Sequence, residues 1–191
     1  GATLNIEEGV KIISVYDNIV DYILVKQGAK INAVGTPDKP IVMTSEKEEP
    51  GAWGGIHICG KAHTNAEGGK GSSEIGGAVY GGNDDADNSG TLQYIRLEYT
   101  GFAFDEEHEA NGISFYGVGN GTIVDHCEAY KGSDDGFEFF GGSVNVSNMV
   151  VVSCSDDSFD WTEGWNGKGT DLVAYQEAKA TLGYDCDCLI E

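Results

Sequence analysis

Basic residues are scarce in this sequence. It has 11 lysines and arginines against 32 aspartates and glutamates, which gives a formal net charge of −21, and Arg96 is the only arginine. A surface of this charge repels phosphate backbones and anionic lipid headgroups, which argues against binding to nucleic acid or to anionic membranes. The same charge favours divalent cations, basic partners, or simply the solubility of an extracellular protein.

Long apolar runs and prolines are also lacking. No segment approaches the run of about 18 apolar residues that spans a bilayer, so we expect no direct membrane insertion. No signal peptide is visible, and we expect the chain to be a processed or partial product. With only 3 prolines, the 29 glycines suit frequent tight corners between short strands.

Metal-binding cysteine spacings are missing as well. The 5 cysteines form no Cys-x-x-Cys pair and no Cys/His pattern typical of structural zinc. Their odd number leaves at least one unpaired. Since cysteine behaves as a small hydrophobic residue, we expect most of them to be free, buried thiols.

A short acidic motif repeats along the sequence. Residues 133–142 (SDDGFEFFGG) and 155–164 (SDDSFDWTEG) match at an offset of 22 residues (156 minus 134). Residues 111–117 (NGISFYG) form a fainter copy 24 residues upstream (135 minus 111). Apolar and polar residues alternate in each copy, which indicates a strand. This period predicts an all-β fold, a single-domain right-handed parallel β-helix over residues 1–191 with coils of 22–24 residues.

Other segments predict further strands and two excursions from the coils. Apolar or alternating stretches bounded by turn residues occur at 4–6, 10–12, 23–25, 30–33, 41–43, 53–58, 92–99, 172–175 and 189–190. Residues 60–90 have little periodicity and predict a long loop that is functional or disordered, and residues 105–109 a smaller one. Because no terminal segment resembles a cap, we expect further chain or self-association, end-to-end or side-by-side, at the C-terminal end.

Aligning the coils brings acidic residues together. Two inward columns are expected, one of Ile113, Phe137 and Phe159 and one of Phe115, Phe139 and Trp161. On the opposite face Ser114, Glu138 and Asp160 form a row, with neighbouring strands about 4.8 Å apart. The corners that precede these strands add Asp134, Asp135, Asp156 and Asp157.

Three interpretations of these carboxylates remain open. They could hold Ca²⁺, which takes six to eight oxygens at about 2.4 Å. They could be catalytic, as in inverting glycosidases, where two carboxyls lie about 6.5–9.5 Å apart. They could also cap backbone N–H groups through Asx turns and have no other role. The candidates for both the metal site and the catalytic site are Asp134, Asp135, Asp156, Asp157 and Asp160.

Aromatic side chains supply candidates for glycan binding. Trp165, Tyr116 and Tyr130, together with the carboxylate of Glu138, are the predicted ligand-binding residues. Trp53 and Tyr175 are expected to share the exposed side of the solenoid, whereas the parity of Trp161 places it in the core.

Several motifs resemble a known family. Residues 33–45 (AVGTPDKPIVMTS) are similar to the A-x-G-T-x-x-x-P-I-x-F-T-S coil of secreted bacterial right-handed β-helix proteins, and residues 53–56, 80–84, 90–99 and 134–138 extend the similarity. In sum the sequence resembles uncharacterised cell-surface β-helix lipoproteins of Bacteroidetes-type bacteria. The resemblance implies export and glycan-related work, with no assigned catalytic residues.

A more distant similarity is to polygalacturonase-type hydrolases and pectate lyases. Residues 132–135 (GSDD) resemble the G-D-D corner of the hydrolases, but their G-H-G and R-I-K motifs are missing. The lyases need an arginine or lysine beside Ca²⁺, and the nearest lysines in sequence are Lys131 and Lys168. We therefore expect an extracellular or outer-surface module that is non-catalytic, binds polysaccharide or is structural, and can hold Ca²⁺. The alternative is a polysaccharide-degrading hydrolase or lyase that uses the stacked aspartates.

Overall fold

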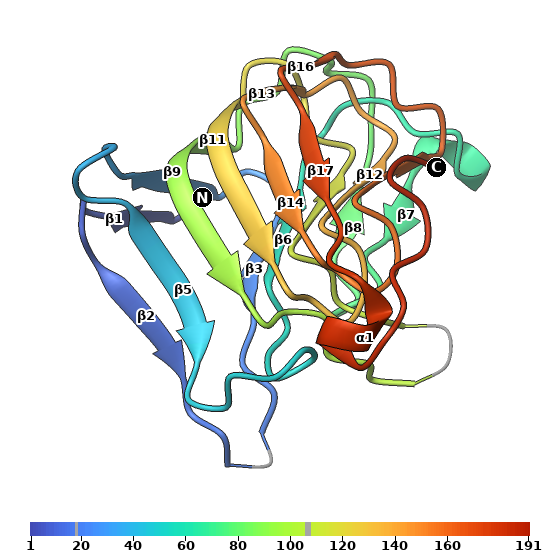
Figure 1. Ribbon diagram of the computed structural model, residues 1–191. Coiled ribbons are helices and arrows are strands. Elements are labelled where there is room, and N and C mark those ends of the chain that lie inside the picture. The colour runs from blue at the N-terminus through green and yellow to red at the C-terminus, as the bar shows by residue number, and fades with distance from the viewer. Residues whose placement is uncertain (18, 106–107) are drawn as a thin grey trace.

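The protein is a stack of coils made almost entirely of parallel strands (Figure 1). The computed structural model describes residues 1–17, 19–105 and 108–191. Glycine and Asx residues at the corners divide the chain into short strands whose apolar side chains alternate inward. The prediction of an all-β parallel β-helix is confirmed.

One sheet of ten strands forms two flanks of the solenoid. The first flank runs through β1 (Thr3–Ile6), β4 (Lys30–Val34), β9 (Gly90–Glu98), β11 (Ile123–Tyr130), β13 (Asn145–Ser147) and β16 (Gly169–Thr170). The second flank runs through β2 (Lys11–Ser14), β5 (Ile41–Ser45), the later halves of β9 and β11, β14 (Val150–Val152) and β17 (Val173–Tyr175). The long strands β9 and β11 belong to both flanks and join them.

A second sheet closes the solenoid. Its order is β15 (Phe159–Thr162), β12 (Phe137–Phe140), β10 (Ile113–Tyr116), β6 (Ile56–Cys59) and β3 (Ile23–Val25). Ile113 pairs with Phe137, and Phe137 pairs with Phe159. These pairs confirm the offsets of 24 and 22 residues found in the sequence (137 minus 113 and 159 minus 137).

The core lies between the two sheets. The rings of Phe115 and Phe139 stack with centroids 5.0 Å apart and an interplanar angle of 9°. Two expectations about tryptophan are wrong. Trp161 is 42% exposed because β15 is an edge strand, whereas Trp53 is 3% exposed and donates its indole N–H to the Glu98 carbonyl.

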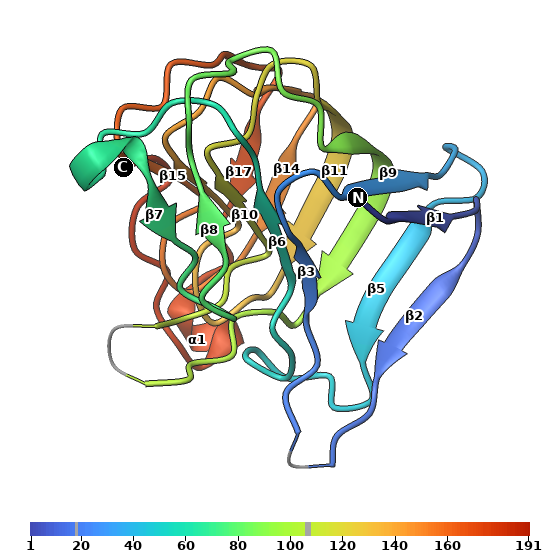
Figure 2. The same cartoon turned by 180° about the vertical axis from the view of Figure 1, so that it is seen from behind.

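The excursion at residues 60–90 is folded, which the sequence did not predict. It contains the 3₁₀ helix η1 (Glu67–Gly69) and an antiparallel hairpin of β7 (Gly71–Ser72) and β8 (Val79–Tyr80), visible at the back of the molecule (Figure 2). Ala78 and Tyr80 pack against Cys59, Tyr116 and Phe140 in a second hydrophobic cluster. The hairpin therefore covers part of the outer face of the five-stranded sheet.

The remaining features are minor. The short helix α1 (Lys179–Leu182) follows β17 and ends at Gly183 in the left-handed conformation. All five cysteines are free, and Cys59, Cys127 and Cys154 are buried as expected, whereas Cys186 is half-buried and Cys188 exposed. Within the part of the chain that the structure describes, no helix has the length and apolar character needed to cross a membrane.

Candidate functional site

The acidic corners stack in the order that the repeat predicts. Asn111, Asp135 and Asp157 occupy equivalent corners, and the Gly112 and Gly136 amides donate to the Asp135 and Asp157 carbonyls at 2.9 Å. The Asp135 carboxylate accepts the Asp157 amide N–H at 2.9 Å, and the Asp157 carboxylate accepts the Cys188 amide N–H at 2.9 Å. One oxygen of each carboxylate thus caps the next coil, as the turn-capping interpretation expects.

Beside these corners lies a cavity of about 290 Å³. Corner residues, two residues of the five-stranded sheet, both excursions and the C-terminal segment line it. The described lining is entirely acidic: Glu74, Glu109, Asp134, Asp135, Glu138, Asp156, Asp157, Asp160 and Glu191. The described lining of the cavity therefore includes no basic side chain.

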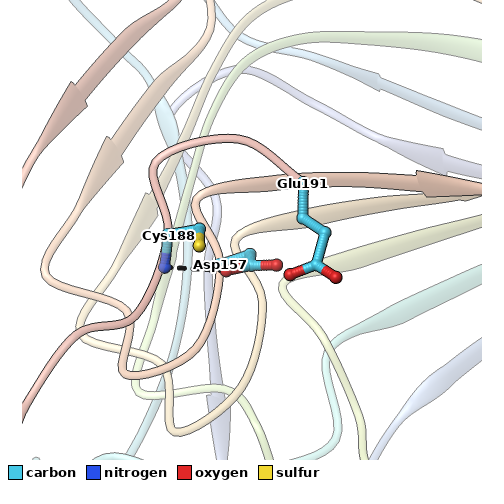
Figure 3. Close-up of side chains that lie close together, drawn as sticks. All are labelled: Asp157, Cys188 and Glu191. Carbon is cyan, nitrogen blue, oxygen red and sulfur yellow. Dashed lines mark hydrogen bonds between the residues drawn. The ribbon is translucent and has the colours of Figure 1, made fainter.

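Three groups of side chains could each hold one cation. Their ligand atoms fall within 4.8 Å of one another, about the span of two oxygens on opposite sides of Ca²⁺. The first group is Asp134, Asp135 and Asp156, and the second is Asp135, Glu138 and Asp160. The third is Asp157, Cys188 and Glu191, drawn in Figure 3 with the hydrogen bond from Cys188 to Asp157. Asp135 belongs to two groups, which makes it the central carboxylate.

Burial and mutual repulsion raise the pKa values of the cavity carboxyls. Burial, then the charges of Glu109 and Asp156, raise the pKa of Asp134 to about 8. Burial and the neighbouring Asp134 raise the pKa of Asp135 to about 9. Burial and Asp135 raise the pKa of Glu138 to about 10. These carboxyls therefore ionise together near neutral pH only when a cation compensates them.

Asn111 is a buried hydrogen-bond partner of Glu138. Its side-chain amide donates to the Glu138 carboxylate at 2.6 Å and contacts the Ser114 hydroxyl at 3.0 Å. Asn111 is 1% exposed, and its amide oxygen has no hydrogen-bond partner among the residues that the structure describes. A buried acceptor without a partner is costly, and a nearby cation or water would satisfy it.

Carboxylate oxygens are hard donors of the kind that Ca²⁺ prefers. The five predicted aspartates and Glu138 all lie at the cavity, with Glu138 paired to Asp160 across neighbouring strands. Sequence reasoning missed Glu74, Glu109 and Glu191, because their approach depends on the excursions and the C-terminal segment. The alignment of the coils places Asn111 in the same corner column as Asp135 and Asp157, and this alignment is the sequence signal for its position beside the cavity.

The aromatic candidates do not form one platform. Tyr116 is 0% exposed, so its expected exposure is wrong: the β7–β8 hairpin covers it. Trp165 is half-buried, with its ring 4.6 Å from that of Phe139. Tyr130 is half-buried, and the Arg96 guanidinium lies 4.5 Å from its ring centroid. Of the residues expected on the exposed side, Tyr175 is exposed.

The fold and this cavity define a class, a parallel β-helix with a carboxylate-lined site at its corners. The family described as "Pectate-lyase like beta helix domain" matches residues 1–190, and the chain belongs to it. No curated protein and no solved structure matches the sequence significantly.

Proposed function

We propose that the chain is an extracellular, non-catalytic carbohydrate-binding module whose acidic cavity holds Ca²⁺. The observation that carries this proposal is the described lining of nine carboxylates, with no basic side chain among them, around about 290 Å³. Membership of the pectate-lyase-like family supports a role with carbohydrate. The similarity of the motifs to bacterial surface lipoproteins supports export to the cell surface.

The residues that would hold the cation belong to the two groups that contain Asp135. Asp134 and Asp156 lie on one side, and Glu138 and Asp160 on the other. When bound, Ca²⁺ supplies positive charge and open coordination positions for the oxygens of a sugar. Without it, the carboxylates repel an anionic glycan. We therefore expect uronate-containing glycans to bind only when Ca²⁺ is present.

The first test is thermal unfolding with Ca²⁺ and with EDTA. A cation that binds only the folded chain at a hundredfold excess over its Kd raises the melting temperature by about 5–10 °C. We expect this shift in the wild type, and its loss in Asp135→Asn. The exposed Asp84→Asn, outside the cavity, is the matched control and should keep the shift. An equal shift in Asp135→Asn, or none in the wild type, would contradict the cation site.

The second step tests the glycan. Calorimetric titration of tetragalacturonate should show binding in Ca²⁺ and none in EDTA. Binding of the same strength in both conditions would contradict a calcium-dependent site.

A hydrolase is the second candidate, because a carboxyl with a raised pKa can act as a general acid beside an ionised carboxylate. Asp135 and Glu138, with pKa values of about 9 and 10, supply candidates for the protonated acid of such a pair. Release of reducing ends from a polysaccharide, lost in Asp135→Asn while binding is kept, would favour the hydrolase. A lyase is less well supported, because Arg96 lies on the other sheet in ion pairs with Glu98 and Glu128.

A further inference from the structure

A second groove lies on the ten-stranded sheet, away from the acidic cavity. It has a volume of about 320 Å³ and crosses β9, β11 and the residues around β14, with the turn between β4 and β5 at one end. Pro37, Tyr94, Arg96, His126, Glu128 and Asn148 are among its lining residues. No residue of this groove lines the acidic cavity, so the two sites are separate.

Two rings form one wall of this groove. The Tyr94 and His126 rings stack with centroids 4.4 Å apart and an interplanar angle of 23°. The His126 Nδ1 lies 2.8 Å from the Asp125 carboxylate, which fixes the orientation of the imidazole. Asp125 in turn accepts hydrogen bonds from the Ser147 hydroxyl and the Asn148 amide at 2.7 and 2.8 Å. The wall is therefore held in place before any ligand arrives.

The two rings stand on backbone in the left-handed conformation. Tyr94, His126, Asn148 and Asp171 stack at the bend of the sheet with φ values of 51°, 52°, 53° and 54°. Asparagine, aspartate and histidine adopt this left-handed conformation more readily than other residues, and a tyrosine is disfavoured there. Tyr94 therefore stands where asparagine would fold more easily.

Carboxylates outnumber the cationic groups in and around the groove. Arg96 pairs with Glu98 at 2.6 Å and with Glu128 at 3.3 Å, and His126 faces Asp125. The groove offers a ligand the two rings and the polar side chains of Arg96, Glu128 and Asn148. Its one guanidinium is already paired with two carboxylates. An anionic sugar would be repelled by Glu98, Glu128 and Asp125.

We propose that this groove binds a neutral sugar residue of a glycan, without Ca²⁺. The C–H face of the sugar lies against the Tyr94 ring, and its hydroxyl groups bond to Arg96, Glu128 and Asn148. Stacking of an apolar face on a ring, with a few oriented polar groups beside it, is the general chemistry of such recognition.

Affinity electrophoresis of the whole chain in EDTA tests this proposal. Gels would contain xylan, glucomannan, β-glucan or galactan as neutral polysaccharides, and polygalacturonate as the anionic one. We expect retardation by at least one neutral polysaccharide and none by polygalacturonate. Tyr94→Asn should weaken the neutral interaction about tenfold or more without lowering the melting temperature, because asparagine suits the backbone there.

Tyr16→Asn is the matched control, the same change at an exposed tyrosine outside the groove, and it should bind as the wild type does. Absence of retardation in every neutral gel would overturn the proposal, as would unchanged binding in Tyr94→Asn. Binding that requires Ca²⁺ and is lost in Asp135→Asn would also overturn it, because the acidic cavity would then be the sugar site. That last outcome would leave the proposed function standing.

Discussion

At the scale of single residues, the corner aspartates combine two roles that the sequence offered as alternatives. One oxygen of Asp135 accepts the Asp157 amide, and one oxygen of Asp157 accepts the Cys188 amide. A carboxylate has further lone pairs, so capping one amide leaves oxygens free to face the cavity. Capping therefore explains why Asx residues stand at these corners, and it does not explain the density of acids around them.

The corner residue Asn111 gives the first residue-scale prediction. In EDTA, Asn111→Asp should lower the free energy of unfolding by about 1–3 kcal/mol, because it removes the amide donor to Glu138 and adds a buried acid. Added Ca²⁺ should recover more stability in this variant than in the wild type. Denaturant unfolding with EDTA and with Ca²⁺ measures both effects.

The control for that variant is Asn83→Asp, which makes the same chemical change at an exposed position outside the cavity. It should unfold as the wild type does in both conditions. If Asn111→Asp were as stable as the wild type in EDTA, the amide of Asn111 would not support Glu138.

At the scale of elements, side chains fasten the 60–90 excursion to the last coil. The Glu163 carboxylate accepts the Tyr80 hydroxyl at 2.9 Å and also the Thr64 hydroxyl. His63 contacts the Asp85 carboxylate at 2.8 Å and the Gly164 carbonyl at 2.9 Å. The excursion is thus tied to the corner that follows β15, and it brings Glu74 to the acidic cavity.

Glu163→Ala should loosen this excursion. The buried Tyr80 hydroxyl and the Thr64 hydroxyl lose their acceptor, which costs about 1–3 kcal/mol, and the loss should appear first as local opening. Amide hydrogen exchange should speed up in residues 61–66 and 78–81 and stay nearly unchanged in β9 and β11. Glu67→Ala, exposed on η1, is the control. Equal exchange in Glu163→Ala and the wild type would show that the carboxylate does not hold the excursion.

At the scale of the whole molecule, the sequence predicts the repeated coils and does not predict the 60–90 excursion, which occurs once. The columns of Ile113, Phe137 and Phe159 followed from a period of two within strands and from the match between coils. The folding of residues 60–90 could not be predicted, because the hairpin has no copy elsewhere in the chain. The burial of Tyr116 under this hairpin could not be predicted for the same reason. The alternation of residues along a strand shows which face a side chain lies on, but not which other segment covers that face.

The buried carboxyls of the cavity give the last prediction, the dependence of stability on pH. In the folded chain the pKa values of Asp134, Asp135 and Glu138 are raised to about 8, 9 and 10, mainly by burial. The ordinary values are 3.8 for aspartate and 4.5 for glutamate. At pH values between the ordinary and the raised pKa values, the folded state binds more protons than the unfolded state, so stability falls as pH rises. In EDTA the melting temperature should therefore be higher at about pH 5 than at about pH 9.

One further group, Asp125, sets the acid limit of this profile. Asp125 has its pKa lowered to about 2, with burial opposing hydrogen bonds from Asn148 and Ser147 and the contact with His126. Its contribution is present above the ordinary value of 3.8 and is lost as pH falls through about 2, so stability should decline again in strong acid. Saturating Ca²⁺ should flatten the alkaline side, because the cation binds the ionised carboxylates. A melting temperature in EDTA that stays constant or rises from about pH 5 to about pH 9 would show that the carboxylates ionise without a cation, and the case for a metal in the cavity would then fail.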